Sequence, residues 1–134
     1  MVQGGAYAEY IVLEEEHAAI KPKNISFEEA ASIPLAALTA YQSLFDAAKI
    51  NPGETILIHA AAGGVGGFGV QLATDHGAVV WGTASGRNKE YVQDLGVAQL
   101  VDYHQVDFRD SVRSEFPDGV DVVFDCVGGE VLEI

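Results

Sequence analysis

The chain has 134 residues, which predicts about one domain, and 49% of its residues are hydrophobic. Twenty acidic and seven basic side chains give a formal net charge of −13, which excludes nucleic acid as a partner because most of the surface would repel a phosphate backbone. No apolar run approaches the roughly 18 residues that span a bilayer, and the start, MVQGGAYAEY, lacks the basic segment and apolar core of a signal peptide. Its one cysteine, Cys126, excludes a disulfide framework and a cysteine-rich zinc site, which favours a reducing, cytoplasmic compartment. Together these features predict a globular, cytoplasmic protein with no membrane partner.

The first 25 residues carry a β-type pattern. Residues typical of strands recur at every second position, namely Tyr7, Glu9, Ile11 and Leu13. We therefore expect short strands between Gly5 and Lys21. No partner strands for them follow in the sequence, so this segment resembles the end of another domain.

Two helices are predicted between residues 26 and 50. Ser26 and Glu29 have the spacing of a capping box, which opens a helix. Pro34 disfavours helical geometry at the residue before it, so we expect a short helix that stops there. A longer helix should then run from about Leu35 to Ala48. The sequence Asn-Pro-Gly at residues 51–53 turns the chain into the next element.

A glycine-rich turn follows, between a predicted strand at residues 55–60 and a predicted helix at residues 65–76. Strand, glycine turn and helix together bring backbone N–H groups and a helix N-terminus up to a dinucleotide pyrophosphate. Two registers of the motif compete, Gly64-x-Gly66-x-x-Gly69 and Ala61-x-Gly63-x-x-Gly66. We prefer the second because it begins where the strand ends. The alternative is a tight turn between packed elements with no ligand.

After this turn the chain alternates strands and helices. Further strands are predicted at residues 79–84, 100–102 and 120–125, with a helix at about residues 88–95 and another capped by Asp107. Gly77 and Gly96 are expected to end their helices. The pattern predicts a doubly wound parallel sheet. Such a sheet usually has six strands and only four are found here, so we expect an internal piece of a longer protein.

Six segments carry a family resemblance, in this order along the chain: GGAYAEYIV, LAALTAYQSL, HAAAGGVGGFGVQLA, GTAS, VDY and FDCVGGEVL. Together they resemble the medium-chain dehydrogenase/reductase superfamily, and within it the zinc-free, NADPH-dependent quinone oxidoreductase branch. The resemblance covers essentially the whole chain. It implies a partial Rossmann-type sheet preceded by the C-terminal end of a GroES-like β domain. Residues 1–25 would be that domain end, residues 26–50 linking helices and residues 51–134 part of the NADP-binding domain.

The same resemblance implies cofactor-binding residues. The pyrophosphate loop would consist of Ala62, Gly63, Gly64 and Val65. Thr39 would lie near the nicotinamide, although packing within its helix is an equal alternative. Tyr103 resembles a tyrosine that approaches the adenosine phosphate, and its alternative is an exposed aromatic on a loop. Val127 and Gly128 follow the fourth strand, where this fold places its cofactor crevice, and could equally form a plain turn.

Zinc is not expected. Zinc-dependent alcohol dehydrogenases carry a cysteine ligand at the position that matches Leu35, and a leucine cannot bind a metal. Three of the histidines, His17, His76 and His104, have no metal-ligand spacing between them. His59, next to the glycine turn, is most simply a buried, hydrogen-bonded histidine.

The choice of cofactor can be predicted from the end of the second strand. NAD-selective members of this fold place an acid about 20 residues after the glycine turn, and an arginine suits the 2′-phosphate of NADP. Here residues 82–89, GTASGRNK, contain no acid, and the first one after them is Glu90. Ser85, Arg87 and Lys89 in the same stretch could hold a phosphate. We therefore expect NADPH. The alternative is that both cations are solvated loop or helix residues.

The predicted function is transfer of a hydride from NADPH to a quinone or an α,β-unsaturated carbonyl compound. This segment alone is expected to be inactive, and the full-length protein is expected to be a homo-oligomer. No general acid can be assigned in this chain. Two alternatives stay open, an enoyl-reductase module of a larger synthase and a non-catalytic NADPH-binding member of the superfamily.

Overall fold

The computed structural model describes residues 5–129. Contacts divide the chain into two compact units, with the boundary between Ser32 and Ile33. The larger unit holds the sheet and the candidate site. The smaller unit contains the turn that opens the first long helix.

The smaller unit contains no strand within residues 5–32, so the expected short strands between Gly5 and Lys21 are wrong. The segment has one 3-10 turn, η1 (Glu15–His17), and its apolar side chains, Tyr7 and Val12 among them, are exposed. A strand needs a hydrogen-bonded neighbour, and isolated extended segments are marginal in water. The alternating pattern therefore has no local partner to pair with.

The predicted capping box is confirmed. The backbone N–H of Ser26 donates to Glu29 Oε2 at 2.7 Å, and the backbone N–H of Glu29 donates to Ser26 Oγ at 3.1 Å. The helix that follows, α1 (Phe27–Tyr41), contains Pro34, so the predicted interruption at that residue is wrong. Proline costs one backbone hydrogen bond, and burial of Ala40 and of Leu44 further along the chain outweighs that local cost. The helix continues directly into a π-helical segment, η2 (Gln42–Ala47).

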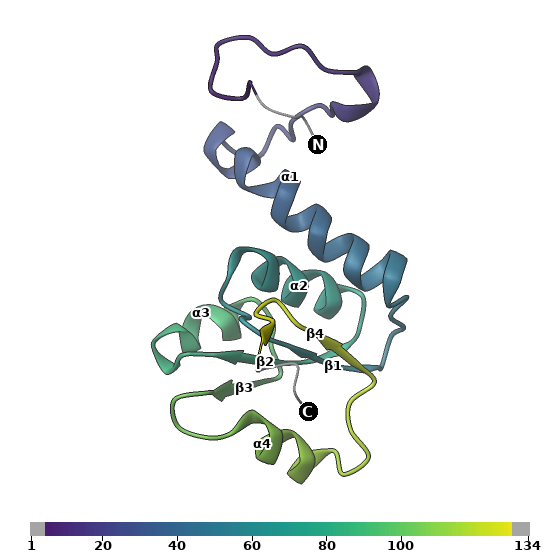
Figure 1. Cartoon of the computed structure of the whole chain (residues 1–134), viewed down its shortest axis with the longest axis vertical. Coiled ribbons are helices and arrows are strands. Elements are labelled where there is room, and N and C mark those ends of the chain that lie inside the picture. Colours follow the sequence, from purple (N-terminus) through teal and green to yellow (C-terminus); the bar gives the residue numbers. More distant parts are fainter. Residues whose placement is uncertain (1–4, 130–134) are drawn as a thin grey trace. The chain divides into compact units, whose positions relative to one another are not determined.

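A four-stranded parallel sheet forms the larger unit, with strand order β3-β2-β1-β4 (Figure 1). Its strands are β1 (Thr55–Ile58), β2 (Val79–Ala84), β3 (Gln99–Asp102) and β4 (Val122–Phe124). Each strand predicted in this part of the chain is present, and its ends differ from the prediction by at most two residues. Helices α2 (Gly64–Asp75) and α3 (Lys89–Asp94) lie on one face and α4 (Phe108–Glu115) on the other, so the sheet is doubly wound as predicted.

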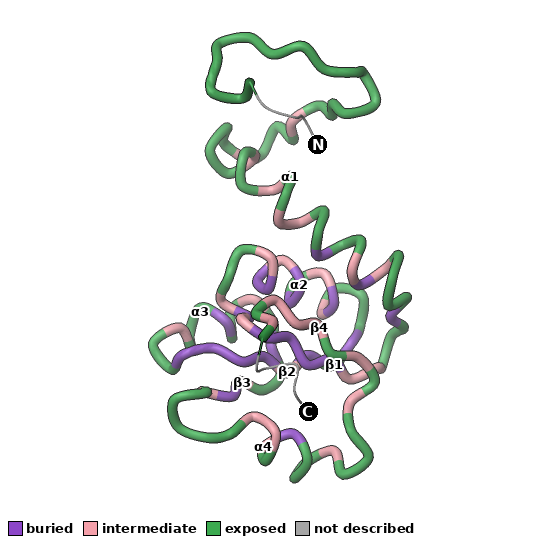
Figure 2. The backbone as a smooth tube through the Cα atoms, viewed as in Figure 1, coloured by how far each residue is buried: buried purple, intermediate pink, exposed green. Residues whose placement is uncertain are grey.

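The core lies between β1, β2 and the helices α2 and α3 (Figure 2). Its largest fully buried side chains include Ile56, Ile58, Val70, Val80 and Val92. Gly77 (φ +95°) and Gly96 (φ +105°) follow α2 and α3, as predicted for helix ends. β4 is less buried than expected for a strand covered on both faces, because Val123 is 43% exposed.

Across residues 5–129 we find no helix with the length and apolar character required to cross a membrane.

Candidate functional site

The turn between β1 and α2 is shaped by a close approach of helix and strand. Ala60 has a left-handed backbone (φ +53°), and its carbonyl accepts a hydrogen bond from the Gly63 N–H at 2.8 Å. A Cβ at Gly66 would overlap that same carbonyl. Only glycine lets the first turn of α2 lie this close to the end of β1. The third position of the motif needs such an approach, which favours the register Ala61-x-Gly63-x-x-Gly66.

The neighbouring glycines have different surroundings. A Cβ at Gly64 would meet only the Ala36 Cβ, at an ordinary 3.8 Å. A Cβ at Gly69 would lie 3.0 Å from the Phe124 ring, so Gly69 allows α2 to pack on β4. Gly63 caps α2 in an extended conformation and faces a cavity. The residue that precedes the first turn of α2 thus borders the cavity, and the positive end of the helix dipole favours an anion there.

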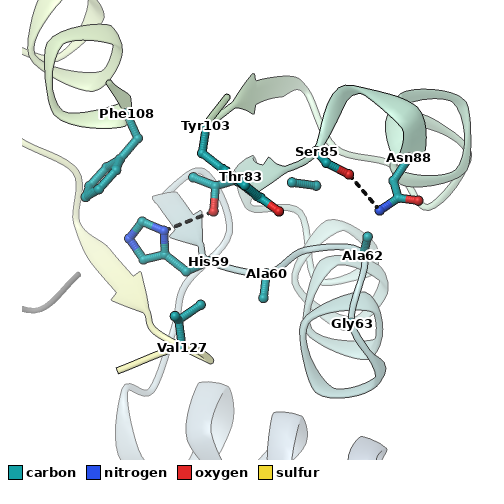
Figure 3. A pocket seen from close by; sticks show the side chains of 11 residues that line it. His59, Ala60, Ala62, Gly63, Thr83, Ser85, Asn88, Tyr103, Phe108 and Val127 are labelled. Carbon is teal, nitrogen blue, oxygen red and sulfur yellow. Dashed lines mark hydrogen bonds between the residues drawn. The ribbon is translucent and has the colours of Figure 1, made fainter. Parts of the chain in front are cut away.

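The cavity has a volume of about 510 Å³ and lies at the carboxyl ends of the strands (Figure 3). Ligand sites in proteins are commonly about 300–1,000 Å³. In open α/β sheets, ligands bind at the carboxyl edge, where the strand order reverses. Here β1 lies between β2 and β4, so the reversal falls between β1 and β4. The lining residues are His59, Ala60, Ala62, Gly63, Thr83, Ala84, Ser85, Asn88, Tyr103, Phe108 and Val127.

His59 is one of three buried polar residues that line this cavity, together with Thr83 and Ser85. Only 2% of the residue is exposed, and its Nδ1 lies 3.0 Å from Thr83 Oγ1. The ring meets the Phe108 ring edge-on, with centroids 4.6 Å apart. Its Nε2 has no hydrogen-bond partner among the described residues. The predicted buried, hydrogen-bonded histidine is thus confirmed, with one ring nitrogen left for a ligand or a water molecule.

Burial lowers the pKa of His59 below its usual value of about 6.5. The Asp125 carboxylate raises this pKa and the Arg109 guanidinium lowers it, and both effects are smaller than that of burial. The imidazole is therefore neutral near pH 7 and offers one donor and one acceptor nitrogen.

Asp125 organises the turn after β4. Its carboxylate accepts the Val127 N–H at 2.8 Å and the Gly128 N–H at 3.0 Å, and the first of these bonds is the main reason that its pKa is lowered. Burial and the Asp125 charge raise the pKa of the adjacent Cys126 thiol to about 11. The thiol is thus protonated at neutral pH and is a weak nucleophile.

The segment after β2 carries the side chains predicted to select the cofactor. Ser85 is buried, and its Oγ accepts a hydrogen bond from Asn88 Nδ2 at 3.3 Å. Arg87 and Lys89 are exposed on either side of Asn88. Arg87 lines a second pocket beside the first, together with Tyr103.

An acid from the neighbouring strand also lies in this region, which the sequence of the segment after β2 does not predict. Asp102 ends β3 and pairs with Ala84 of β2. A Cβ at Gly86 would overlap Asp102 Oδ2, so the carboxylate lies directly against the loop after β2. Asp102 lies on the strand beside β2, so it is remote in sequence from the segment that ends at Glu90.

The structure brings together five of the eleven predicted cofactor-binding residues in the main cavity: Ala62, Gly63, Ser85, Tyr103 and Val127. Six do not line it: Thr39, Gly64, Val65, Arg87, Lys89 and Gly128. Arg87 lines the adjoining pocket. The Thr39 hydroxyl donates to the Leu35 carbonyl at 2.7 Å, which is the helix role given as its alternative.

Six lining residues were missed by the sequence reasoning: His59, Ala60, Thr83, Ala84, Asn88 and Phe108. Those at the ends of β1 and β2 could have been found, because every strand end of a parallel sheet meets the same edge. Phe108 carries no such signal. It reaches the cavity because α4 begins beside His59. Among residues 5–129, no three His, Cys, Asp or Glu side chains gather as a metal site.

The strand order and the glycine turn define a Rossmann-type nucleotide-binding fold. The family model for zinc-binding dehydrogenases matches residues 64–134. The chain therefore belongs to this family, within the medium-chain dehydrogenase/reductase superfamily that its motifs indicated.

Two curated relatives illustrate the range of the family. The chain is 39% identical to the synaptic vesicle membrane protein VAT-1 homolog of Danio rerio over 128 residues, 95% of this chain and 26% of that protein. It is 42% identical to the chloroplastic NADPH-dependent alkenal/one oxidoreductase of Arabidopsis thaliana, over 94% of this chain and 32% of that enzyme. The chain thus spans about a third or less of the length of these relatives.

Two solved structures are similar in fold and sequence. The CurK enoyl reductase superposes with a TM-score of 0.80 and 44% identity, covering 85% of this chain and 35% of that one. The quinone oxidoreductase from Coxiella burnetii superposes with a TM-score of 0.75 and 43% identity, covering 83% of this chain and 33% of that one.

Proposed function

We propose that this chain is the cofactor-binding part of an NADPH-dependent oxidoreductase that reduces quinones or α,β-unsaturated carbonyl compounds. The observation that carries the proposal is the glycine turn, in which Gly66 lets the first turn of α2 lie against the end of β1 and Gly63, the N-cap of α2, lines the cavity at the carboxyl edge of the sheet. The family membership and the names of the alkenal/one and quinone oxidoreductases support the reaction class.

The described residues fit a dinucleotide. The Gly63 backbone faces the cavity with no side chain in the way, and the N–H groups at the start of α2 would hold a pyrophosphate. The lining of the cavity is largely apolar with a few polar side chains, which suits the flat rings of a nucleoside. His59 Nε2 is a buried polar atom that a ligand group could satisfy. Bound NADPH would supply the hydride, and these residues would hold and orient the cofactor.

The preference for NADPH is proposed from the segment after β2. Ser85 can donate a hydrogen bond to a 2′-phosphate, and Arg87 and Lys89 are exposed cations close to it in sequence. Charge-assisted bonds of this kind are stronger than neutral ones. Tyr103 lines the same two cavities as Ser85 and would border the same end of the cofactor.

A zinc-free reaction is part of the proposal. It rests on Leu35, which stands where zinc-dependent relatives carry a cysteine ligand. An enzyme that lacks a Lewis acid favours substrates that accept a hydride readily, such as quinones and enones, over simple alcohols.

We further propose that turnover needs the rest of the protein. The matched relatives are about three to four times as long as this chain, and no residue that lines the cavity is assigned as a proton donor to a substrate. The proposed setting is a cytoplasmic homo-oligomer. Light scattering of the full-length protein measures the number of subunits.

The test combines binding with turnover. The full-length protein is titrated with NADPH by fluorescence and then assayed with a simple quinone and a simple enone. Binding with turnover of either substrate is expected, whereas the 134-residue chain alone should show little or no turnover. Absence of NADPH binding in the full-length protein would refute the proposal, and full activity of the short chain would refute the claim that it needs the remainder.

A second candidate is an enoyl-reductase module, favoured by the similarity to the CurK enoyl reductase. Such a module would reduce an enoyl thioester faster than a free quinone, so a crotonyl thioester assay separates the two. A third candidate is a protein that binds NADPH without turnover, and the name of the VAT-1 homolog, which states no reaction, is compatible with it. Binding with no oxidation by any of the three substrate types would favour it.

A further inference from the structure

We propose that Asp102 is a specificity-determining residue whose carboxylate lies in the part of the site that distinguishes NADPH from NADH and weakens the preference for NADPH. This inference rests on the proposed function. Asp102 is not among the residues that the sequence predicts to bind the cofactor. Asp102 comes from β3, whereas the predicted phosphate-binding side chains follow β2.

The position of Asp102 is fixed by the sheet and by its own turn. β2 and β3 are parallel, and Ala84 pairs with Asp102, so both strands end at the same level. Asp102 Oδ1 accepts the His104 N–H at 3.0 Å. The other oxygen, Oδ2, faces Gly86, where a Cβ would overlap it. The carboxylate is therefore held against the backbone between Ser85 and Arg87.

The Asp102 carboxylate and the Arg87 guanidinium belong to residues that line one pocket of about 480 Å³. This pocket is lined by Ser85, Gly86, Arg87, Asp102, Tyr103, His104 and Gln105. Ser85 and Tyr103 also line the main cavity, so the two spaces adjoin. An anion in this pocket is attracted by the Arg87 guanidinium and repelled by the Asp102 carboxylate.

The two cofactors differ at the group that would enter this pocket. A ribose 2′-hydroxyl can donate a hydrogen bond to a carboxylate, which is how acids in this fold select NAD. A 2′-phosphate has no donor to offer when ionised, and like charges a few ångströms apart repel. Asp102 therefore favours the hydroxyl while Arg87 favours the phosphate. Their opposition predicts a protein that prefers NADPH only moderately and also binds NADH.

The test uses Asp102→Asn in the full-length protein. Asparagine keeps the shape of the side chain and the acceptor for the His104 N–H but removes the charge. The probes are adenosine 2′,5′-bisphosphate and 5′-AMP, which differ only at the 2′ position. We expect the affinity for the bisphosphate to rise roughly three- to tenfold, with no gain for 5′-AMP. The gain should shrink between about 50 and 500 mM salt, since salt screens charge repulsion but leaves a packing effect unchanged.

The matched control is Asp94→Asn. Asp94 is an exposed acid at the end of α3, and its replacement changes the net charge by the same amount. The ratio of the two probe affinities should stay at the wild-type value in this variant. An equal rise in Asp94→Asn would assign the effect to overall charge and overturn the proposal.

A second variant, Asp102→Ser, keeps an oxygen near the His104 N–H and also lacks the charge. If both variants fail to fold, Asp102 is a structural residue and the proposal is overturned. If the wild-type protein binds neither probe, the proposed function fails and this inference fails with it. If both probes bind and the ratio is unchanged in folded Asp102→Asn, the inference alone is wrong.

Discussion

The turn after β1 and the loop after β2 border the same cavity but are built in opposite ways. In the first, Ala61 is fully buried and Gly66 is pressed against the Ala60 carbonyl, so packing dictates the residue types. In the second, Arg87 and Lys89 are exposed and little besides Ser85 is buried. The first region can recognise what both nicotinamide cofactors share, through its backbone. The second can vary without harm to the fold and so can determine which cofactor binds.

The largest expected effect comes from Gly66→Ala. The added methyl would overlap the Ala60 carbonyl, so the strand end or α2 must shift, at a cost of about 3 kcal/mol or more in the free energy of unfolding. Urea denaturation measures this loss. Gly64→Ala is the control, because its methyl would meet only the Ala36 Cβ at an ordinary distance. Equal stability of the two variants would contradict the close packing of this turn.

Gly63→Val tests whether the same turn binds the part common to both cofactors. Gly63 lines the cavity and has an extended backbone (φ −79°, ψ 170°) that valine can adopt, although its Cβ would meet the Ala60 carbonyl at a tight 3.1 Å. The branched side chain would therefore hinder a phosphate that approaches the start of α2. The affinities for NADPH and NADH should both fall, on the order of a hundredfold, with a melting temperature close to wild type. Fluorescence titration measures both. Unchanged affinities would mean that the turn only connects two elements.

The hydrogen bond between His59 and Thr83 joins the ends of β1 and β2. Thr83→Val removes the hydroxyl and leaves both ring nitrogens of His59 unpaired, at a cost of about 1–3 kcal/mol in unfolding free energy. Thr83→Ser keeps the hydroxyl and should lose clearly less. Chemical denaturation of the pair decides the matter, and a larger loss in the serine variant would rule out this role of the hydroxyl.

The smallest expected effect is a pH dependence due to His59. Its pKa is lowered in the folded protein, so the unfolded chain binds the proton first and stability is lost as the pH falls below about 6.5. The slope from this one group is at most about 1.4 kcal/mol per pH unit. Asp125, whose pKa is lowered from 3.8, acts only at more acid pH. Urea denaturation at pH 7.5 and 5.5 should show the loss in wild type and a smaller loss in His59→Phe. The same loss in both proteins would assign it to other groups.

The sheet could be predicted from the sequence because its signals are local. Apolar runs at residues 55–60 and 79–84 gave strands within two residues of those observed, and Gly77 and Gly96 marked the helix ends. Alternation of strands with helices then restricts the sheet to a parallel, doubly wound arrangement. The capping box at Ser26 was found for the same reason.

The sequence-based predictions are wrong or incomplete where the structure depends on contacts between residues far apart in the sequence. Period-two spacing near Tyr7 lacked the neighbouring strand that a β-ladder requires. Pro34 lies inside a helix because residues beyond it, such as Leu44, are buried. In the candidate site, Asp102 and Phe108 reach the cavity region from β3 and α4, and neither position can be read from the spacing around the glycine turn.

We propose that the loop after β2 selects NADPH while the turn after β1 binds either cofactor. The most direct test of this proposal is the titration of the full-length protein and of Arg87→Ala/Lys89→Ala with NADPH and NADH. We expect the double variant to lose about tenfold or more in NADPH affinity, since two charge-assisted contacts are removed, and to keep its NADH affinity within about twofold. An equal loss for both cofactors would mean that Arg87 and Lys89 do not select NADPH.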